Sequence, residues 1–478
     1  MKAICKSFIF IALISVCVPT LLFAQKKWVK VAAGGRFSAA LRSDGTIWEC
    51  GRARQGQLGN GNNDTSFVLR FSQTGTDTDW VDVEAGEAHC LALKKDGSLW
   101  AWGNNLNGEL GVGDSIDRYY PQRVGTDHDW TYISASSYAS YAIKKDGSIW
   151  GWGFNHDGEL GDSNRVDQAT PAKIDGAHKW KKICAGYPFS IALRSDGTLW
   201  ASGFNGDGDL GNGTLQNSTT MLQVNADSDW VDMSSGWNFT IALKKNGTIW
   251  SWGYDGDAQL GQGNVTPVSK PKQILSDTDW AKIYTGCLFA FGIKKDGTLW
   301  GWGDNYLGEL GNGNTNQQDF PLKIGNAADW RMVSGAKGYK ISSSTLRGFS
   351  TLAIHGDSSR ICVTGQNDYG QLGNGTTQSV YQFDCNVNTG IPNVSSQFKG
   401  IKVYPNPAHD FVGINLANDI TGDYRINLYD VNGKKVLVET TGLALESNQL
   451  DISGLKPGVY LLEIVSDKEV YQTKIIKN

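Results

Sequence analysis

The stretch DGTLWGWGDNYLGELGNG, residues 296–313, decides the fold of this chain because close copies of it recur along most of the sequence. Its Asp-Gly pair favours a type I′ hairpin turn, in which both central residues need positive φ. The run after it is typical of a strand, and residues two apart, Trp300 and Trp302, then share one face of a sheet. The glycine-rich remainder predicts a loop. The stretch therefore predicts the second half of a hairpin and the connection that follows it.

Working outward, each copy belongs to a longer unit that begins with a tryptophan. The seven tryptophans are spaced by 52 residues once and then by 50 residues five times. Each unit holds two apolar runs, an Asp-Gly or Asn-Gly turn, the tryptophan run, the glycine-rich loop and a final stretch that often contains proline. This order predicts four short strands per unit, the last one at an edge. The units begin at Trp28, Trp80, Trp130, Trp180, Trp230, Trp280 and Trp330.

Seven four-stranded units are compatible with a closed propeller or with an open solenoid. The unit length and strand number fit a propeller blade. Trp150 and Trp152 face one side of a strand while Gly151 faces the other, and large residues opposite small ones suit sheets that pack face to face. We therefore predict an all-β protein with a seven-bladed β-propeller over residues 28–385. The regular recurrence of the tryptophans favours packing over a platform for stacking carbohydrate.

The repeats resemble those of the regulator of chromosome condensation family, whose motif is nearly intact at residues 296–313. The resemblance covers roughly residues 28–385 and implies a seven-bladed propeller. It implies little about function, because the founding member binds chromatin and promotes nucleotide exchange on a small GTPase inside the nucleus. A secreted bacterial relative, the propeller-type β-lactamase inhibitory protein, binds its enzyme with one face of the disk. A protein-binding role is the nearer expectation for this chain.

The seventh unit departs from the pattern. Trp330 and Gly365 are 35 residues apart, against 23 for Trp80 and Gly103, so 12 residues are extra. They fall mainly in residues 336–348. The usual turn and tryptophan are replaced by Asp-Ser-Ser-Arg-Ile-Cys at residues 357–362, although the later loop motif returns. The unit is expected to form a blade, and the sequence leaves open how the ring closes.

After Cys385 the repeat stops. Residues 386–398 are polar and are interpreted as a linker, and residues 399–478 lack tryptophan and show new strand runs. The motifs YPNP at 404–407, DVNGK at 430–434 and LKPGVY at 455–460 resemble the C-terminal sorting domain of type IX secretion substrates. That resemblance implies a small β-sandwich recognised by the type IX secretion machinery. An unrelated adhesion sandwich is the alternative.

The first 24 residues are interpreted as a signal peptide. Two lysines precede a nearly unbroken apolar run from Phe8 to Phe23, and Ala24 offers a cleavage point. A transmembrane anchor is the alternative, but the run is short for a span of about 20 residues and contains Pro19. No other segment is predicted to cross a membrane. We therefore expect a protein that is secreted or held on the outer cell surface.

Composition excludes several classes of function. Loss of two signal-peptide lysines changes the formal charge from −4 to −6, and no basic stripe is present, so a nucleic-acid partner is not expected. The cysteines left after export form no CxxC pair, so no metal site is predicted, while Cys362 and Cys385 are a candidate disulfide. No catalytic motif or cofactor fingerprint is found. Asp207 and Asp209 fall in a turn that lacks the glycine and glutamate of a calcium loop.

Topology indicates where a ligand binds. In a four-stranded meander, the loops after the first and third strands share one face, and these loops vary most between units. Variable loops with aromatic residues on a rigid scaffold suit ligand contact, although some rings could instead shield their own loops. The candidate contact residues in the first loops are Arg36, Glu87, Tyr138, Tyr187, Trp237 and Leu288. Those in the third loops are Phe154, Phe204, Tyr254, Tyr306 and Tyr369.

Three functional hypotheses remain. The preferred one is a non-enzymatic exported module that binds an extracellular protein or glycan through the variable face. The second is an extracellular enzyme that degrades polysaccharide or peptide in the central funnel, which would need carboxylates or histidines clustered near the axis. The third is a surface-layer or adhesion component without a single partner.

Overall fold

The computed structural model describes residues 26–61, 67–338, 340–342, 345–346, 349–387, 401–416, 424–430, 435–441, 449–466 and 470–478. The predicted signal peptide and most of the predicted linker lie outside these residues. The described residues form strands, turns and loops without a helix. Among them no helix is present that is long and apolar enough to cross a bilayer.

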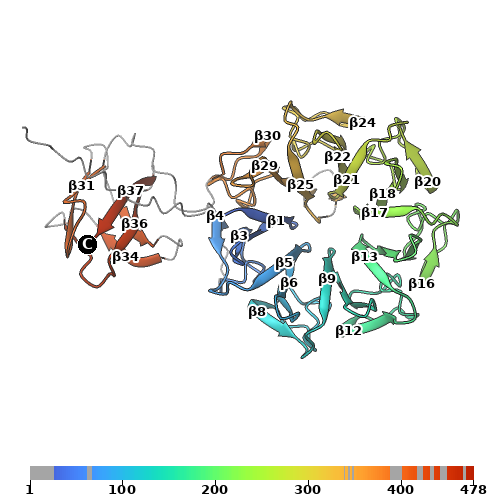
Figure 1. Ribbon diagram of the computed structural model, residues 1–478, viewed down its shortest axis with the longest axis horizontal. Coiled ribbons are helices and arrows are strands. Elements are labelled where there is room, and N and C mark those ends of the chain that lie inside the picture. Colours follow the sequence, from blue (N-terminus) through green and yellow to red (C-terminus); the bar gives the residue numbers. More distant parts are fainter. Residues whose placement is uncertain are drawn as a thin grey trace, which may run out of the picture.

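Seven four-stranded antiparallel sheets follow one another around a ring, which confirms the predicted propeller (Figure 1). The innermost strand of each sheet starts at the unit's first tryptophan, and its side chains alternate between the neighbouring blade and the central axis. The inner strands are β1 (Trp28–Ala33), β5 (Trp80–Ala85), β9 (Trp130–Ala135), β13 (Trp180–Ala185), β17 (Trp230–Ser235), β21 (Trp280–Thr285) and β25 (Trp330–Gly335).

The second strand of each blade carries the second apolar run and is buried along nearly its whole length. These strands are β2 (Phe37–Arg42), β6 (His89–Lys94), β10 (Ala139–Lys144), β14 (Phe189–Arg194), β18 (Phe239–Lys244), β22 (Phe289–Lys294) and β28 (Ser350–His355). The third strand carries the tryptophan run. These strands are β3 (Ile47–Arg52), β7 (Leu99–Gly103), β11 (Ile149–Gly153), β15 (Leu199–Gly203), β19 (Ile249–Gly253), β23 (Leu299–Gly303) and β29 (Ile361–Gly365).

The outermost strand of each blade contains more exposed residues and, in several blades, the predicted edge proline. These strands are β4 (Phe67–Gln73), β8 (Arg118–Val124), β12 (Gln168–Asp175), β16 (Ser218–Gln223), β20 (Val268–Ile274), β24 (Gln318–Lys323) and β30 (Val380–Asp384). The extra residues of the seventh unit lie between β25 and β28, where β26 (Lys340–Ser342) pairs with β27 (Thr345–Leu346).

Blade-to-blade packing explains the repeated tryptophans. Trp152 is fully buried, and its Nε1 donates to the Glu109 carbonyl in the preceding blade at 2.9 Å. The Trp130 and Trp150 rings pack edge to face with centroids 5.8 Å apart. The tryptophans are therefore packing residues, as predicted. Separate apolar clusters lie between successive blades rather than in one common centre.

The ring closes through the same contacts that join every other pair of blades. The Trp28 amide donates to the Ser358 carbonyl at 2.8 Å, which matches the bond from Trp80 to Gly45 at 3.1 Å. The Gly375 amide donates to the Leu69 carbonyl at 2.8 Å, which matches the bond from Gly61 to Tyr119. Among the described strands, each blade is built from one continuous part of the chain, which answers how the ring closes.

The cysteines behave as the sequence suggested. Cys362 on β29 and Cys385, just after β30, form a disulfide. Cys50, Cys90, Cys184 and Cys287 are free and buried. In the described residues, one group of possible metal ligands lies close enough together to hold an ion, namely His355, Cys362 and Cys385. The disulfide uses both thiols of this group.

The C-terminal region forms two sheets around one apolar core. The three-stranded sheet contains β31 (Ile401–Tyr404), β32 (Phe411–Leu416) and β35 (Gln449–Asp451). The four-stranded sheet contains β34 (Lys435–Thr441), β33 (Tyr424–Tyr429), β36 (Gly458–Ser466) and β37 (Val470–Lys477). Residues of both sheets, including Val412, Leu428 and Leu462, share one buried cluster, as expected for a small sandwich.

Candidate binding face of the propeller

The loops after the inner strands and those after the third strands lie side by side on one face, here called the loop face. The Phe154 amide, at the start of a third loop, donates to the Tyr138 carbonyl in a first loop at 2.9 Å. The pairs Phe204–Pro188 and Tyr254–Asn238 repeat this bond. The predicted sharing of one face by the two loop sets is therefore observed.

The first loops are also joined from blade to blade around the axis. The Tyr187 amide donates to the Trp237 carbonyl, and the Trp237 amide donates to the Cys287 carbonyl, both at 2.9 Å. The Lys337 amide donates to the Ala33 carbonyl at 3.3 Å. Backbone bonds of this kind hold the loop tips in fixed positions, so side chains on them are presented on a rigid support.

Four aromatic side chains gather on one side of the loop face, here called the aromatic patch. The Tyr138 ring lies 5.5 Å from Tyr187 and 6.3 Å from Phe154 between centroids. The Phe154 ring lies 6.2 Å from Tyr187 and 4.3 Å from His156. The three predicted residues of the patch are half-buried, so each ring keeps an accessible edge. The sequence analysis did not single out His156 for this surface, although it lies two residues beyond Phe154.

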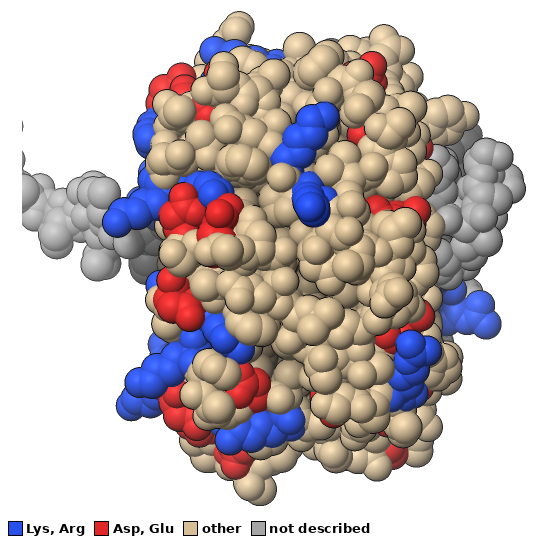
Figure 2. Space-filling model, turned by 90° about the vertical axis from the view of Figure 1, so that its right-hand side faces the viewer, with Lys and Arg blue, Asp and Glu red and all other residues tan. Residues whose placement is uncertain are grey.

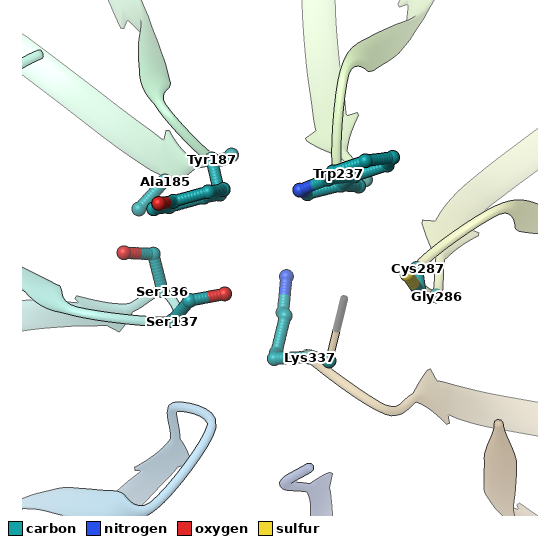
Figure 3. Close-up of a pocket in the computed structure, with 11 residues that line it drawn as sticks. Ser136, Ser137, Ala185, Tyr187, Trp237, Gly286, Cys287 and Lys337 are labelled. Atoms are coloured by element: carbon teal, nitrogen blue, oxygen red, sulfur yellow. The ribbon is translucent and has the colours of Figure 1, made fainter. Parts of the chain in front are cut away.

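A pocket opens on the axis beside the aromatic patch, here called the axial pocket (Figure 3). Its lining comes mainly from five first loops and includes Ser137, Tyr187, Trp237, Cys287 and Lys337. It encloses about 10 Å³, which is room for about one group the size of a water molecule. Figure 3 shows the Ser137 hydroxyl, the Trp237 indole nitrogen and the Lys337 ammonium directed toward its centre.

The other predicted contact residues differ in their surroundings. Phe204 and Tyr254 fold over their own loops: a Cβ at Gly206 would lie 2.4 Å from the Phe204 ring, and a Cβ at Gly256 would lie 1.9 Å from the Tyr254 hydroxyl. This is the shielding role that the sequence analysis left open. Leu288 is fully buried in the apolar cluster between blades, so its proposed contact with a ligand is withdrawn.

The remaining positions lie at separate places on the loop face. Tyr306 is 66% exposed at a third-loop tip. The Arg36 guanidinium lies over the Tyr369 ring at 4.7 Å, in a cation–π contact between the first and last blades. Glu87 is half-buried, and its carbonyl accepts a bond from the Gly35 amide at 2.9 Å. The structure therefore brings Tyr138, Phe154, Tyr187 and Trp237 toward one region and leaves the others apart.

Below the axial pocket, a polar channel of about 260 Å³ follows the axis. The sequence analysis missed the charged residues that line it. All but Lys337, which follows β25, occupy the second or fourth position after the opening tryptophan of an inner strand, which alternation places on the axial side. Counting these positions in each unit would have found the four residues on the strands. The charged side chains of the described lining are Lys30, Glu84, Lys182, Asp232 and Lys337.

The channel charges are largely paired with one another. Lys30 lies 2.5 Å from Asp82 and 2.7 Å from Glu84, and Lys182 lies 2.5 Å from Asp232. Burial lowers the pKa of Lys30, but the two carboxylates more than offset this and raise it above its ordinary value. Burial raises the pKa of Asp82 above its ordinary range, although Lys30 opposes the change. The carboxylates that the enzyme hypothesis required are thus present at the axis and are held in ion pairs.

A second set of acidic groups is buried inside the third loops. In the Gly-x-Leu-Gly motif, Glu159 accepts a bond from the Asp157 amide at 3.0 Å, and Asp209 accepts one from the Asp207 amide at 3.2 Å. Burial raises the pKa of both carboxyls to about 8. Glutamine at the equivalent position 259 makes the same bond to the Asp257 amide at 2.9 Å. These groups therefore shape the loop, and Asp207 and Asp209 serve a turn.

Charge on the visible side of the molecule is mixed. Figure 2 shows Lys and Arg interspersed with Asp and Glu, without a continuous basic area on that side. Many charges of the propeller are paired, as where Lys244 lies 2.7 Å from Asp227 and 3.0 Å from Asp229. The same pairing of one lysine with two aspartates occurs in four blades, and it explains the aspartates of the Asp-x-Asp-Trp motif. The visible side therefore offers no track for a phosphate backbone.

Comparison with known protein families agrees with the repeat pattern. The RCC1-like domain matches residues 12–226, and the regulator of chromosome condensation (RCC1) repeat matches residues 230–259, 246–293 and 296–342. The secretion system C-terminal sorting domain matches residues 402–478. The sorting domain indicates export through type IX secretion to the cell surface or the medium.

Curated relatives match only part of the chain. The human E3 ubiquitin-protein ligase HERC2 is 37% identical over 114 residues, which is 23% of this chain and 2% of the ligase. The Arabidopsis thaliana ultraviolet-B receptor UVR8 is 36% identical over 98 residues, which is 20% of this chain and 22% of the receptor. The chain thus spans less than a quarter of the length of either relative.

Solved structures support the fold. Yeast RCC1 (Prp20), in its complex with Kap60, has a TM-score of 0.61 at 18% identity and covers 82% of this chain and 90% of its own. Human WBSCR16 has a TM-score of 0.59 at 20% identity and covers 65% of this chain and 85% of its own. At these identities the likeness concerns the architecture and carries no activity or partner to this chain.

Proposed function

Since the chain carries RCC1-like repeats and a secretion system C-terminal sorting domain, we propose that it is an exported, non-enzymatic module that captures a protein through the loop face. The aromatic patch is the observation that supports this most directly. Half-buried aromatic rings on rigid loops supply apolar contact area at low entropic cost, and such rings dominate binding hot spots.

The orientation of the rings favours a protein over a glycan. Tyr138 and Tyr187 are inclined at 73° to each other, and Phe154 is inclined at 37° to Tyr187 and at 43° to His156. Sugar rings stack on a flat aromatic face that is open to solvent, whereas these rings pack against one another at steep angles. A mixed apolar surface of this shape suits the side chains of a protein partner.

Catalysis in the central channel is the less favoured function. Asp82, Glu84 and Asp232 do lie near the axis, but each is paired with Lys30 or Lys182. A carboxylate held by a lysine is a poor general base, because the ammonium group already occupies the oxygens that would have to accept the substrate proton. Turnover of a polysaccharide or peptide that Asp232→Asn abolishes would reinstate the enzyme hypothesis.

The test is capture of a protein from the medium in which the exporting cells grow. Wild type is compared with the double variant Tyr138→Ser/Tyr187→Ser and with a matched control, Tyr120→Ser. Tyr120 lies on outer strand β8 and is 66% exposed, so it is an aromatic residue at the outer rim, outside the aromatic patch. We expect one protein to be retained by wild type and the control and lost by at least tenfold from the double variant.

The outcomes separate the possibilities. Retention of the protein by the double variant would refute the assignment of the loop face. Loss from the control would indicate the rim of the propeller instead. Thermal unfolding of each variant shows whether the propeller is intact, since the substituted residues are half-buried or exposed.

A further inference from the structure

We propose that the axial pocket holds one carboxylate, supplied by an aspartate or glutamate side chain of the bound protein. This inference rests on the proposed function and names the chemical group that the loop face recognises. It follows from three side chains that converge on a space too small for a larger group.

Two of the three are donors without a partner in the described part of the chain. Ser137 is only 5% exposed, its hydroxyl makes no hydrogen bond with the described residues, and it is directed into the pocket (Figure 3). The Trp237 Nε1–H is also buried and lacks an acceptor. A buried donor without an acceptor destabilises the folded protein, so the Trp237 indole gains when an acceptor enters, and the Ser137 hydroxyl can donate to the same acceptor.

Lys337 supplies the charge. It lines both the axial pocket and the channel beneath, and none of the described carboxylates lies within ion-pair distance of it. The other lysines of the channel lining are already engaged, Lys30 with Asp82 and Glu84 and Lys182 with Asp232. Lys337 is therefore the cation of the channel lining that remains available to a ligand.

The chemistry of the set selects an anion. An indole N–H and an ammonium can only donate, and a serine hydroxyl can donate to an acceptor. Ser136, the other serine of the lining, is already bonded to Ala139 in its own loop at 3.0–3.1 Å. The enclosed space of about 10 Å³ fits one carboxylate oxygen better than a tetrahedral sulfate or phosphate. An aspartate or glutamate at the centre of an otherwise apolar contact provides that oxygen.

A titration on the purified protein tests the inference without the natural partner. N-acetylglutamate α-amide is the probe, and its neutral isostere N-acetylglutamine α-amide is the control ligand. Binding is followed by the indole N–H resonance of Trp237, which Trp237→Phe identifies. We expect the acidic probe to shift this resonance with a dissociation constant in the millimolar range, and the neutral one to leave it unchanged.

Variants assign the contact. Lys337→Met is expected to weaken binding at least tenfold, and Ser137→Ala about threefold. Lys95→Met is the matched control, because Lys95 is exposed next to the Asp-Gly turn of its blade, on the opposite face from the pocket. Unchanged indole resonances elsewhere show that the variants are folded.

The inference is overturned by no shift at 100 mM of the acidic probe, by an equal shift with the neutral isostere, or by full retention of the shift in Lys337→Met. An equal shift with sulfate would mean a general anion site, and tighter binding of glucuronate would mean an acidic sugar; either result also rejects the proposal. If Lys337→Met still captures the partner that the tyrosine double variant loses, the carboxylate inference fails while the proposed function stands.

Discussion

Glu159 gives the propeller a measurable dependence on pH. The residue is 3% exposed, and its backbone carbonyl accepts a bond from Tyr141 of its own blade at 2.8 Å and one from Ser190 of the next blade at 2.7 Å. Burial raises the pKa of the carboxyl from 4.5 to about 8. A carboxyl with a raised pKa in the folded state contributes stability that is complete below its unfolded pKa and is lost as the pH rises through the folded pKa.

The change Glu159→Gln removes this titration and keeps the shape of the side chain. Gln57, Gln259 and Gln371 occupy the same place in other blades and accept the same backbone bond at 2.8–2.9 Å. At 1.36 kcal/mol per unit, the shift sets a ceiling of roughly 5 kcal/mol. We expect about 2–4 kcal/mol, because the loop can open to water before the whole propeller unfolds.

The assay is unfolding in guanidinium chloride, followed by tryptophan fluorescence, between pH 4.5 and pH 9. The stability gained by Glu159→Gln should be near its minimum at pH 4.5 and should increase by about 2–4 kcal/mol by pH 9. Asp319→Asn removes an exposed carboxylate on β24 and is expected to show no such increase. If the difference between Glu159→Gln and wild type stays constant across this range, Glu159 is not protonated in the folded protein, and the reasoning from burial is wrong.

Two further predictions concern how blades hold together. Cys385→Ser opens the disulfide that fastens the end of β30 to β29, and we expect a loss of about 2–4 kcal/mol in denaturant unfolding, which should disappear when wild type is measured with a reductant. Trp152→Phe removes the indole bond to the Glu109 carbonyl and leaves a void between blades. We expect a lower melting temperature and a free energy of unfolding reduced by about 2–3 kcal/mol. An unchanged melting temperature would contradict the role given to this interface.

The blades could be predicted because the sequence features that determine their strands and turns are local and recur in each unit. Each unit carries its own turn residues, its own alternation and its own tryptophans, so one stretch such as residues 296–313 suffices to describe the strands around it. The disulfide between Cys362 and Cys385 could be named only as a candidate, since pairing depends on the geometry of two strands. The position of the extra residues between β25 and β28 followed from the interrupted spacing.

The candidate site was less predictable because its residues come from different units. Tyr138 and Phe154 were identified singly, but their contact with Tyr187 arises only when neighbouring blades are packed. Leu288 occupies the same sequence position as half-buried loop residues such as Arg36 and Tyr138, yet the blade interface buries it fully. Lys337 follows a strand whose unit departs from the repeat, so no pattern pointed to it. Burial and ring geometry depend on the assembled disk, whereas strand and turn depend on adjacent residues.

The closure of the ring has a consequence for how this disk is specified. Every blade is one uninterrupted segment, and the seam between Trp28 and Ser358 uses the same backbone bond as the internal seams. The number seven is then set by the angle at which each sheet packs on the next, because no clasp at the chain ends imposes it. Loss or gain of a whole unit would change the circumference but would leave no strand without its neighbours. In this respect the blades are structurally equivalent, and the blade at which the chain begins is arbitrary.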